Sequence, residues 1–111
     1  MPDFAHPFHG NVDRKLSKEE LIQAIRHDIA GELEAIFVYD AHVMATDDPI
    51  AKKVIGDIRD EEKAHVGELF TLLRMLDPKE AEFFEEGAEE VKELLSELKK
   101  ESKAAKSPKG K

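Results

Sequence analysis

The chain has 111 residues, no cysteine and a formal charge of -8. Its length suits one small domain that is expected to self-associate, and the lack of cysteine excludes disulfides and thiolate metal sites. An acidic chain lacks the basic face that nucleic acid requires, and no apolar run is long enough for a membrane span, so we expect a cytoplasmic protein that binds neither.

Residues 1–15 carry the first two prolines and show no hydrophobic period, which predicts an extended or mobile arm. His6 and His9 in this arm are three residues apart. Two histidines at that spacing can bind a metal, but an arm without a ligand is the simpler interpretation.

Three helices are predicted, each beginning at a capping residue. Ser17 and Glu20 form a capping box that starts a helix over residues 18–45. Asp48 and Pro49 then start a second helix that ends near residue 76.

Asp77 and Pro78 repeat this pattern before a third helix, which is expected to reach about residue 100 with an interruption at Gly87. Residues 16–100 are therefore assigned to one helical domain, and the Lys-rich residues 101–111 to a tail or linker. The predicted fold is all-α: an antiparallel two-helix hairpin plus a C-terminal third helix.

Apolar stripes at steps of four and three run along both hairpin helices. The first stripe comprises Ile25, Ile29, Glu32, Ile36, Tyr39 and Val43. The second comprises Ala51, Ile55, Ile58, Glu62, His65, Leu69, Leu72 and Leu76. Three ionisable residues therefore interrupt the two stripes: Glu32, Glu62 and His65. The third helix has a stripe of its own, which implies a further partner: Phe84, Ala88, Val91, Leu95 and Leu98.

The two glutamates of the stripes are expected at the same level of the hairpin. Glu32 lies 15 residues before Asp47 in the turn and Glu62 lies 15 residues after it. At the usual helical rise, both lie roughly 22 Å from the turn. Burying carboxylates without compensation is costly, and a shared metal ion compensates them. Oxygen and imidazole ligands suit iron, manganese or zinc.

The sequence from Glu62 to His65 is a Glu-x-x-His motif, and Glu32 is a lone glutamate on the other helix. A ferritin-like di-metal site takes two copies of each. One chain therefore supplies half a site, which predicts a homodimer whose two hairpins form a four-helix bundle around two metals. A hydrogen-bonded core histidine is the simpler alternative, and Asp57, Glu61 and Glu68 are interpreted as a solvated face. Tyr39 either packs or hydrogen-bonds a metal ligand.

The segments "GELEAIFVYD", "TDDP" and "RDEEKAH" resemble the encapsulated ferritins, the ferritin-like cargo of encapsulin nanocompartments. The resemblance covers about residues 20–77 and continues into the third helix. It implies a ferroxidase that oxidises Fe(II) with O2 at a di-iron centre between subunits. Mn, Zn or Ca are expected as substitutes for iron in such a site. It also implies a ring of dimers, usually a decamer, that supplies iron for storage inside an encapsulin shell, to which some archaeal members are fused.

By position, the resemblance implies that Glu32, Glu62 and His65 are the ferroxidase ligands. Tyr39 corresponds to a tyrosine close to these ligands. Glu34 corresponds to a carboxylate at the position where metal enters the site. Two positions depart from the family. Gly31 replaces an acid that assists metal uptake, and Val38 replaces a tryptophan.

Two other functions remain open from the sequence. A peroxide-reducing, rubrerythrin-like protein is disfavoured because such proteins typically carry a second, Cys-ligated iron, and this chain has no cysteine. The other open function is structural: an oligomer that bound metal ions hold together and that catalyses no reaction.

Overall fold

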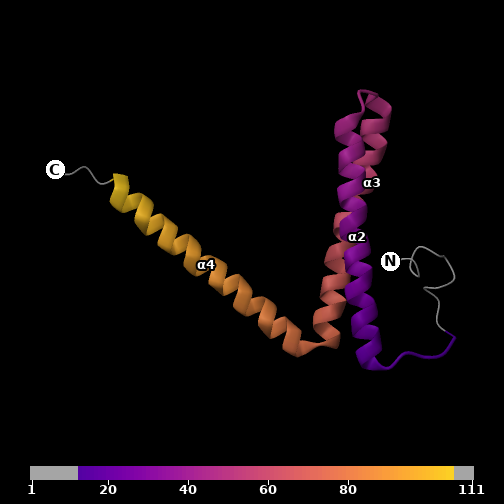
Figure 1. Cartoon of the computed structure of the whole chain (residues 1–111), viewed down its shortest axis with the longest axis horizontal. Coiled ribbons are helices and arrows are strands. Elements are labelled where there is room, and N and C mark those ends of the chain that lie inside the picture. The colour runs from indigo at the N-terminus through magenta and orange to yellow at the C-terminus, as the bar shows by residue number, and fades with distance from the viewer. Residues whose placement is uncertain (1–12, 107–111) are drawn as a thin grey trace. The chain divides into compact units, whose positions relative to one another are not determined.

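The computed structural model describes residues 13–106, which contain helices α2 (Lys18–Ala45), α3 (Pro49–Leu76) and α4 (Pro78–Lys106) (Figure 1). No strand occurs within this described range, so the predicted all-α class is confirmed. The chain divides into two compact units at the boundary between Leu76 and Asp77, and each is described separately. Most of the arm assigned to residues 1–15 lies outside the described residues, as do residues 107–111 of the tail assigned to 101–111, whereas residues 101–106 are part of α4. Across the described helices, none combines the length and apolarity needed to cross a membrane.

The capping box predicted at the start of α2 is present. The Glu20 amide donates to Ser17 Oγ at 3.1 Å, and the Ser17 amide donates to Glu20 Oε1 at 2.9 Å. Arg14 extends this cap, because its two terminal nitrogens donate to the two Glu20 oxygens at 2.9 and 2.6 Å. These hydrogen bonds lower the pKa of Glu20 from its ordinary 4.5 to about 2, and the one from Arg14 has the largest effect.

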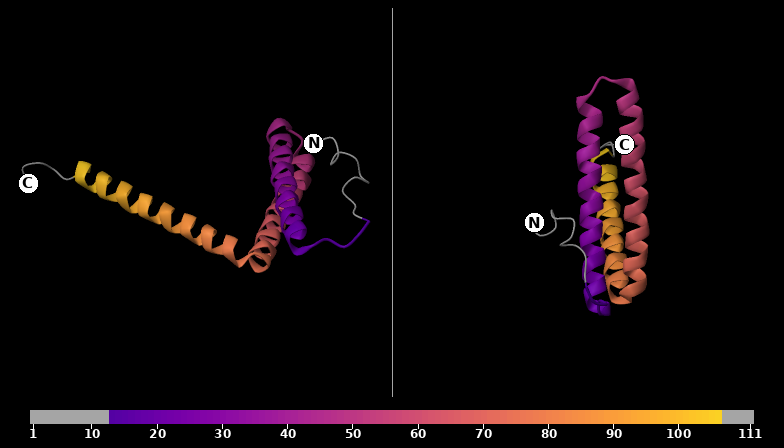
Figure 2. Two further views of the ribbon diagram at one scale, coloured as in Figure 1. Left: turned by 60° about the horizontal axis from the view of Figure 1, so that its bottom comes forward. Right: turned by 90° about the vertical axis from the view of Figure 1, so that its right-hand side faces the viewer.

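The turn between α2 and α3 is fixed by the cap predicted at Asp48. Its Oδ1 accepts hydrogen bonds from the Ile50 and Ala51 amides at 2.9 and 3.1 Å. A side chain that accepts from the first free amides of a helix fixes where the helix begins. With only residues 46–48 between them, α2 and α3 lie side by side and antiparallel (Figure 2).

The hairpin core is small. Three hydrophobic side chains are buried among the described residues: Ile25, Ile29 and Leu73. Ile25 and Ile29 confirm the predicted α2 stripe. The prediction for the α3 stripe is wrong at Leu72, which is 39% exposed, while the neighbouring Leu73 is only 1% exposed. Successive helical residues are about 100° apart, and α3 has apolar residues on two adjacent faces, of which α2 covers only one.

An ion pair between Arg59 and Asp40 joins the two hairpin helices. Arg59 Nη1 of α3 donates to Asp40 Oδ1 of α2 at 2.7 Å, and Arg59 Nε donates to Asp60 Oδ1 at 3.1 Å. These bonds, first to Asp60 and then to Asp40, raise the pKa of Arg59, and the bond from Arg59 lowers the pKa of Asp60. The pair links the two helices one helical turn before Glu62.

Helix α4 begins at the predicted cap, where the Glu80 amide donates to Asp77 Oδ1 at 3.2 Å. The interruption expected at Gly87 is absent, since α4 continues without a break. Its end differs as well, because the helix runs to Lys106 rather than to about residue 100. A single glycine costs a helix only about 1 kcal/mol, which the long flanking segments of good helix formers compensate.

Candidate metal centre

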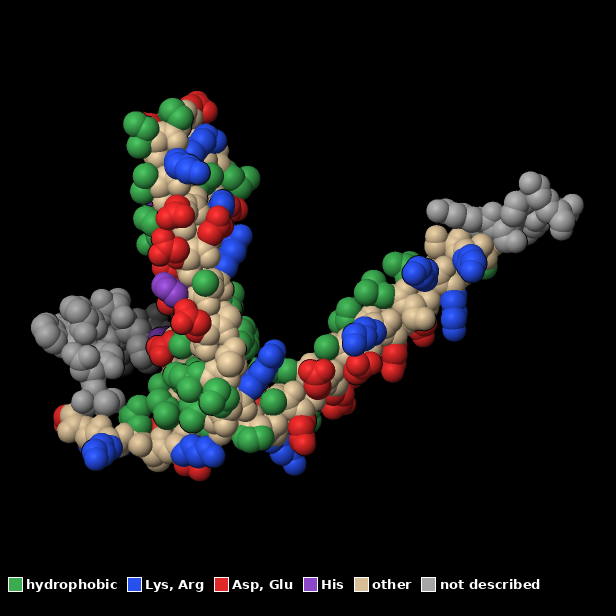
Figure 3. Space-filling view, turned by 180° about the vertical axis from the view of Figure 1, so that it is seen from behind, with side chains coloured by type: hydrophobic (Ala, Val, Ile, Leu, Met, Phe, Trp, Pro, Cys, Tyr) green, Lys and Arg blue, Asp and Glu red, His purple; other side chains and the backbone are tan. Residues whose placement is uncertain are grey.

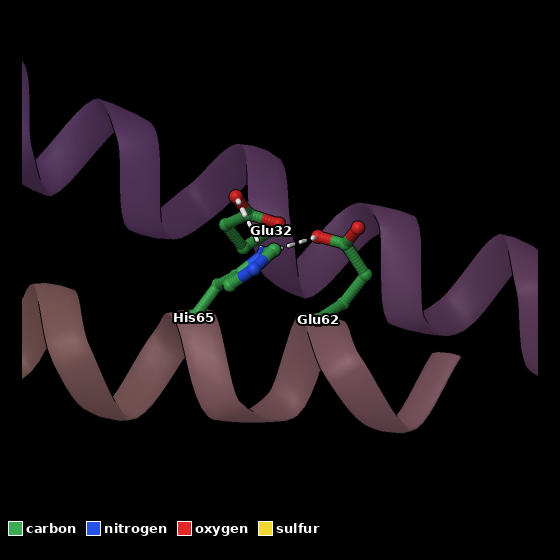
Figure 4. Close-up of side chains that lie close together, drawn as sticks. All are labelled: Glu32, Glu62 and His65. Carbon is green, nitrogen blue, oxygen red and sulfur yellow. Dashed lines mark ion pairs between the residues drawn. The ribbon is translucent and has the colours of Figure 1, made fainter. Parts of the chain in front are cut away.

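The three ionisable residues predicted from the stripes lie together in the hairpin (Figure 4). One ligand atom from each of Glu32, Glu62 and His65 lies within 4.8 Å of the other two. Glu32 projects from α2, and the other two residues project from α3. The expectation that Glu32 and Glu62 share one level is therefore confirmed. Within the described part of the chain, this is the one group of three or more acidic, histidine or cysteine side chains gathered this closely.

Local helix geometry explains the arrangement. Glu62 and His65 are three residues apart on α3, so their side chains lie on one face, one turn apart. The antiparallel pairing then brings Glu32 of α2 to the same place. His65 Nδ1 lies 3.5 Å from Glu62 Oε2 and 3.7 Å from Glu32 Oε1. The imidazole therefore lies between two carboxylates from different helices.

The donor set fits a divalent cation. Two carboxylates and an imidazole are ligands that Fe(II), Mn(II) and Zn(II) accept, and the distances leave room for an ion between them. The glutamates are largely screened from water, with 27% and 18% of the Glu32 and Glu62 side chains exposed. His65 is 48% exposed. One side of the cluster thus opens to the surface of the hairpin, where further ligands can approach.

Tyr39 and Glu34 lie outside this cluster. Tyr39 is half-buried on α2, seven residues beyond Glu32, which places it about two turns away. Glu34 is exposed, and its position two residues beyond Glu32 turns it to another side of the helix. Their assigned roles remain predictions.

An open cavity lies beside Glu32. It is lined by His27, Asp28, Gly31, Glu32 and Leu69. A Cβ atom added at Gly31 would meet no atom within 4 Å, so the missing side chain leaves this space open. Sequence reasoning did not single out His27 or Asp28. The sequence feature that could have identified Asp28 is its spacing, because it precedes Glu32 by four residues and so lies on the same face of α2.

Comparison with known proteins places the chain among ferritin-like proteins. The family model described as ubiquinone biosynthesis protein COQ7 matches residues 19–81. The chain is also 38% identical, over 96 residues, to the encapsulin nanocompartment cargo protein EncC of Myxococcus xanthus. That match covers 86% of this chain and 73% of the relative.

A second relative is the ferritin-like–encapsulin shell fusion protein of Pyrococcus furiosus, which is 43% identical over 84 residues. This match covers 76% of the chain but 24% of the fusion protein, so the chain spans about a quarter of that relative. The crystal structure of the encapsulated ferritin domain from P. furiosus superimposes with a TM-score of 0.74 at 42% identity. It covers 80% of this chain and 91% of that domain. The chain therefore belongs to the encapsulated ferritins, the ferritin-like cargo proteins of encapsulin nanocompartments, and to the sequence family of the COQ7 model.

Proposed function

We propose that this protein is a ferroxidase that oxidises Fe(II) with O2 at a di-iron centre formed between two copies of the chain. The observation that carries the proposal is the convergence of Glu32, Glu62 and His65. Two carboxylates and one imidazole are half of the ligand set that ferritin-like di-iron proteins use. Membership of a ferritin-like cargo family supports iron as the substrate.

The second half of the site is proposed to come from a second copy. The face of the hairpin around His65 carries exposed apolar side chains of α3. Ile58 and Leu72, 37% and 39% exposed, stand seven residues before and after His65 and lie on the same side of the helix. Apolar surface of this extent favours burial against a partner. An isologous contact would bring two copies of the cluster together around a two-fold axis.

In the proposed reaction, Glu32, Glu62 and His65 of each copy bind two Fe(II) ions between the chains. Each Fe(II) gives up one electron. One O2 molecule takes up both electrons and two protons and leaves as H2O2, and two Fe(III) ions remain. The four carboxylates of the two copies balance the charge of two Fe(II) ions, and glutamate side chains are long enough to follow the changing coordination as iron is oxidised. The Fe(III) product then leaves for storage.

The proposed place of action is the inside of an encapsulin nanocompartment. The cargo relative and the shell-fusion relative support this, since their names connect their ferritin-like chains with encapsulin. Ubiquinone chemistry has less support, because the COQ7 model matches residues 19–81 while the cargo relative matches 86% of the chain.

The test is ferric absorbance after Fe(II) is added to the protein in air. We expect Glu32→Ala and His65→Ala to abolish the protein-dependent rise, while Glu61→Ala, which removes an exposed carboxylate next to the cluster, retains it. Oxidation that continues unchanged in both cluster variants would overturn the proposal. Metal binding without any faster oxidation in the unaltered protein would instead identify a structural, metal-stapled oligomer.

A further inference from the structure

The open cavity beside Glu32, here called the Gly31 cavity, leads to the candidate metal centre. Glu32 lines it and is also one of the three clustered ligands. The rest of the lining comes from His27, Asp28 and Gly31 of α2 and from Leu69 of α3. Figure 3 shows acidic and histidine side chains gathered midway along the hairpin. Among the described residues, no lysine or arginine lines the cavity, so its charge favours cations.

The Gly31 cavity is large enough for a metal ion that still carries its water. Its volume is about 520 Å³. A divalent ion with about six water molecules needs on the order of 180 Å³, at about 30 Å³ for each molecule. An ion can therefore enter with its water and exchange that water for protein ligands inside the cavity.

The glycine itself keeps the cavity open. Gly31 lies in the interior of α2, where glycine is one of the weakest helix formers, so helix stability does not account for it. A Cβ atom added there would meet no atom within 4 Å. A larger side chain at this lining position would take up part of the cavity instead of packing against a neighbour. Access to Glu32 is the property that the glycine preserves.

Asp28 supplies a second carboxylate to the cavity, nearer to solvent than that of Glu32. The aspartate is exposed, whereas 27% of the Glu32 side chain is exposed. The two residues are four positions apart, on one face of α2 and about 6 Å apart along its axis. An ion that meets Asp28 first can therefore move to Glu32 along the cavity. Glu34, which the family resemblance places at the metal entry, is not among the residues that line the cavity.

We propose that Fe(II) enters the candidate metal centre through the Gly31 cavity, and that Asp28 binds each hydrated ion briefly before Glu32 takes it over. Asp28 is outside the group of three converging ligands, so its role is delivery of the substrate ion and not ligation in the final centre. The inference rests on the proposed function, because it takes Fe(II) as the ion that is delivered.

The rate of Co(II) binding tests the route without any oxidation. Visible absorbance of Co(II) changes when protein ligands replace its water, so stopped-flow mixing with the full-length protein follows entry directly. We expect Asp28→Asn to slow association about tenfold, and Asp28→Glu to restore most of the rate. The matched control, Glu34→Gln, removes one negative charge two residues from Glu32 but outside the cavity. It should leave the rate unchanged.

Equilibrium affinity separates delivery from ligation. If Asp28 only delivers the ion, Asp28→Asn should weaken Co(II) binding at equilibrium no more than Glu34→Gln does, because release slows along with entry. A much larger loss of affinity in Asp28→Asn would make the aspartate a ligand of the centre and would overturn its delivery role. Equal association rates in Asp28→Asn and the unaltered protein would overturn it as well.

Two substitutions at Gly31 test the cavity by volume. Alanine and leucine are both good helix formers, so Gly31→Ala and Gly31→Leu should each keep α2 intact. We expect Gly31→Ala to bind Co(II) at close to the unaltered rate and Gly31→Leu to bind it several times more slowly. Circular dichroism and native mass show whether the two variants retain the same helices and the same assembly. Equal association rates in these two variants would show that ions enter elsewhere.

The order of mixing connects the route with the proposed oxidation. When Fe(II) is loaded without air and O2 is added last, Asp28→Asn should oxidise its iron as fast as the unaltered protein, because the ions are already in place. When Fe(II) is added last, Asp28→Asn should be slower. Slower oxidation in both orders would contradict a role limited to entry. If the unaltered protein does not oxidise Fe(II), the proposed function fails, whereas the Co(II) association rates still decide the route.

Discussion

His65 Nδ1 lies 3.7 Å from Glu32 Oε1, although 33 positions separate the two residues in the chain and they belong to different helices. The contact depends on the antiparallel pairing of α2 with α3, so any ligand that bridges these side chains also holds the hairpin together. Binding to the folded protein alone stabilises it in proportion to the ligand's affinity.

We therefore expect Mn(II), a redox-stable substitute for Fe(II), to raise the melting temperature of the protein. At about 100 times the dissociation constant, the gain is about 2.7 kcal/mol of unfolding free energy. Glu32→Gln and His65→Gln should lose most of this gain, and Glu61→Gln should keep it. Thermal unfolding followed by circular dichroism measures the effect. An equal gain in all four proteins would show that the ion binds elsewhere.

The contrast between Leu73 and Leu72 separates folding from association. Leu73→Ala should lower the unfolding free energy by about 2–5 kcal/mol, because it leaves a cavity at the most buried side chain of the hairpin. Leu72→Ala should cost less than about 1 kcal/mol in the isolated chain.

If the second copy covers the open face, Leu72→Asp should instead weaken dimerisation. Urea unfolding and native mass, measured on the same variants, distinguish the two effects. Similar unfolding free energies for the two alanine variants would contradict the assigned burial.

The ion pair between Arg59 and Asp40 is expected to contribute modestly. Their side chains are 22% and 49% exposed, so solvent screening keeps the coupling energy small. A double-mutant cycle with Arg59→Met and Asp40→Asn, read by urea unfolding, measures it. The corresponding cycle with Lys92 and Glu89, both on the exposed surface of α4, serves as the control and should give a smaller value. A coupling energy of zero would show that the pair does not stabilise the hairpin.

The cap of α2 should be sensitive to acid. The pKa of Glu20 is about 2 in the folded chain and 4.5 ordinarily, so the folded state binds its proton less readily. The resulting stability is fully present above about pH 4.5 and is lost as the pH falls towards 2. We expect the melting temperature of the unaltered protein to fall more steeply across this window than that of Glu20→Gln. Equal slopes for the two proteins would show that the cap does not respond to this proton.

The helices and the level of the candidate site could be predicted from local sequence. Ser17, Asp48 and Asp77 determine where the helices begin, because each supplies an acceptor for the first unpaired amides. The position of the turn and the constant rise per residue then set Glu32 and Glu62 at the same distance from it. Sequence alone therefore determined three helices and one converging cluster.

Only the tertiary structure decided which face of α3 meets α2. Leu72 and Leu73 are equally apolar, and a period of 3.6 residues allows either to face the core. Packing selected Leu73, and the face with Leu72 and His65 stayed partly exposed. The choice depends on how side chains from two helices interlock, which is a property of the pair and is not encoded in the pattern of either helix alone.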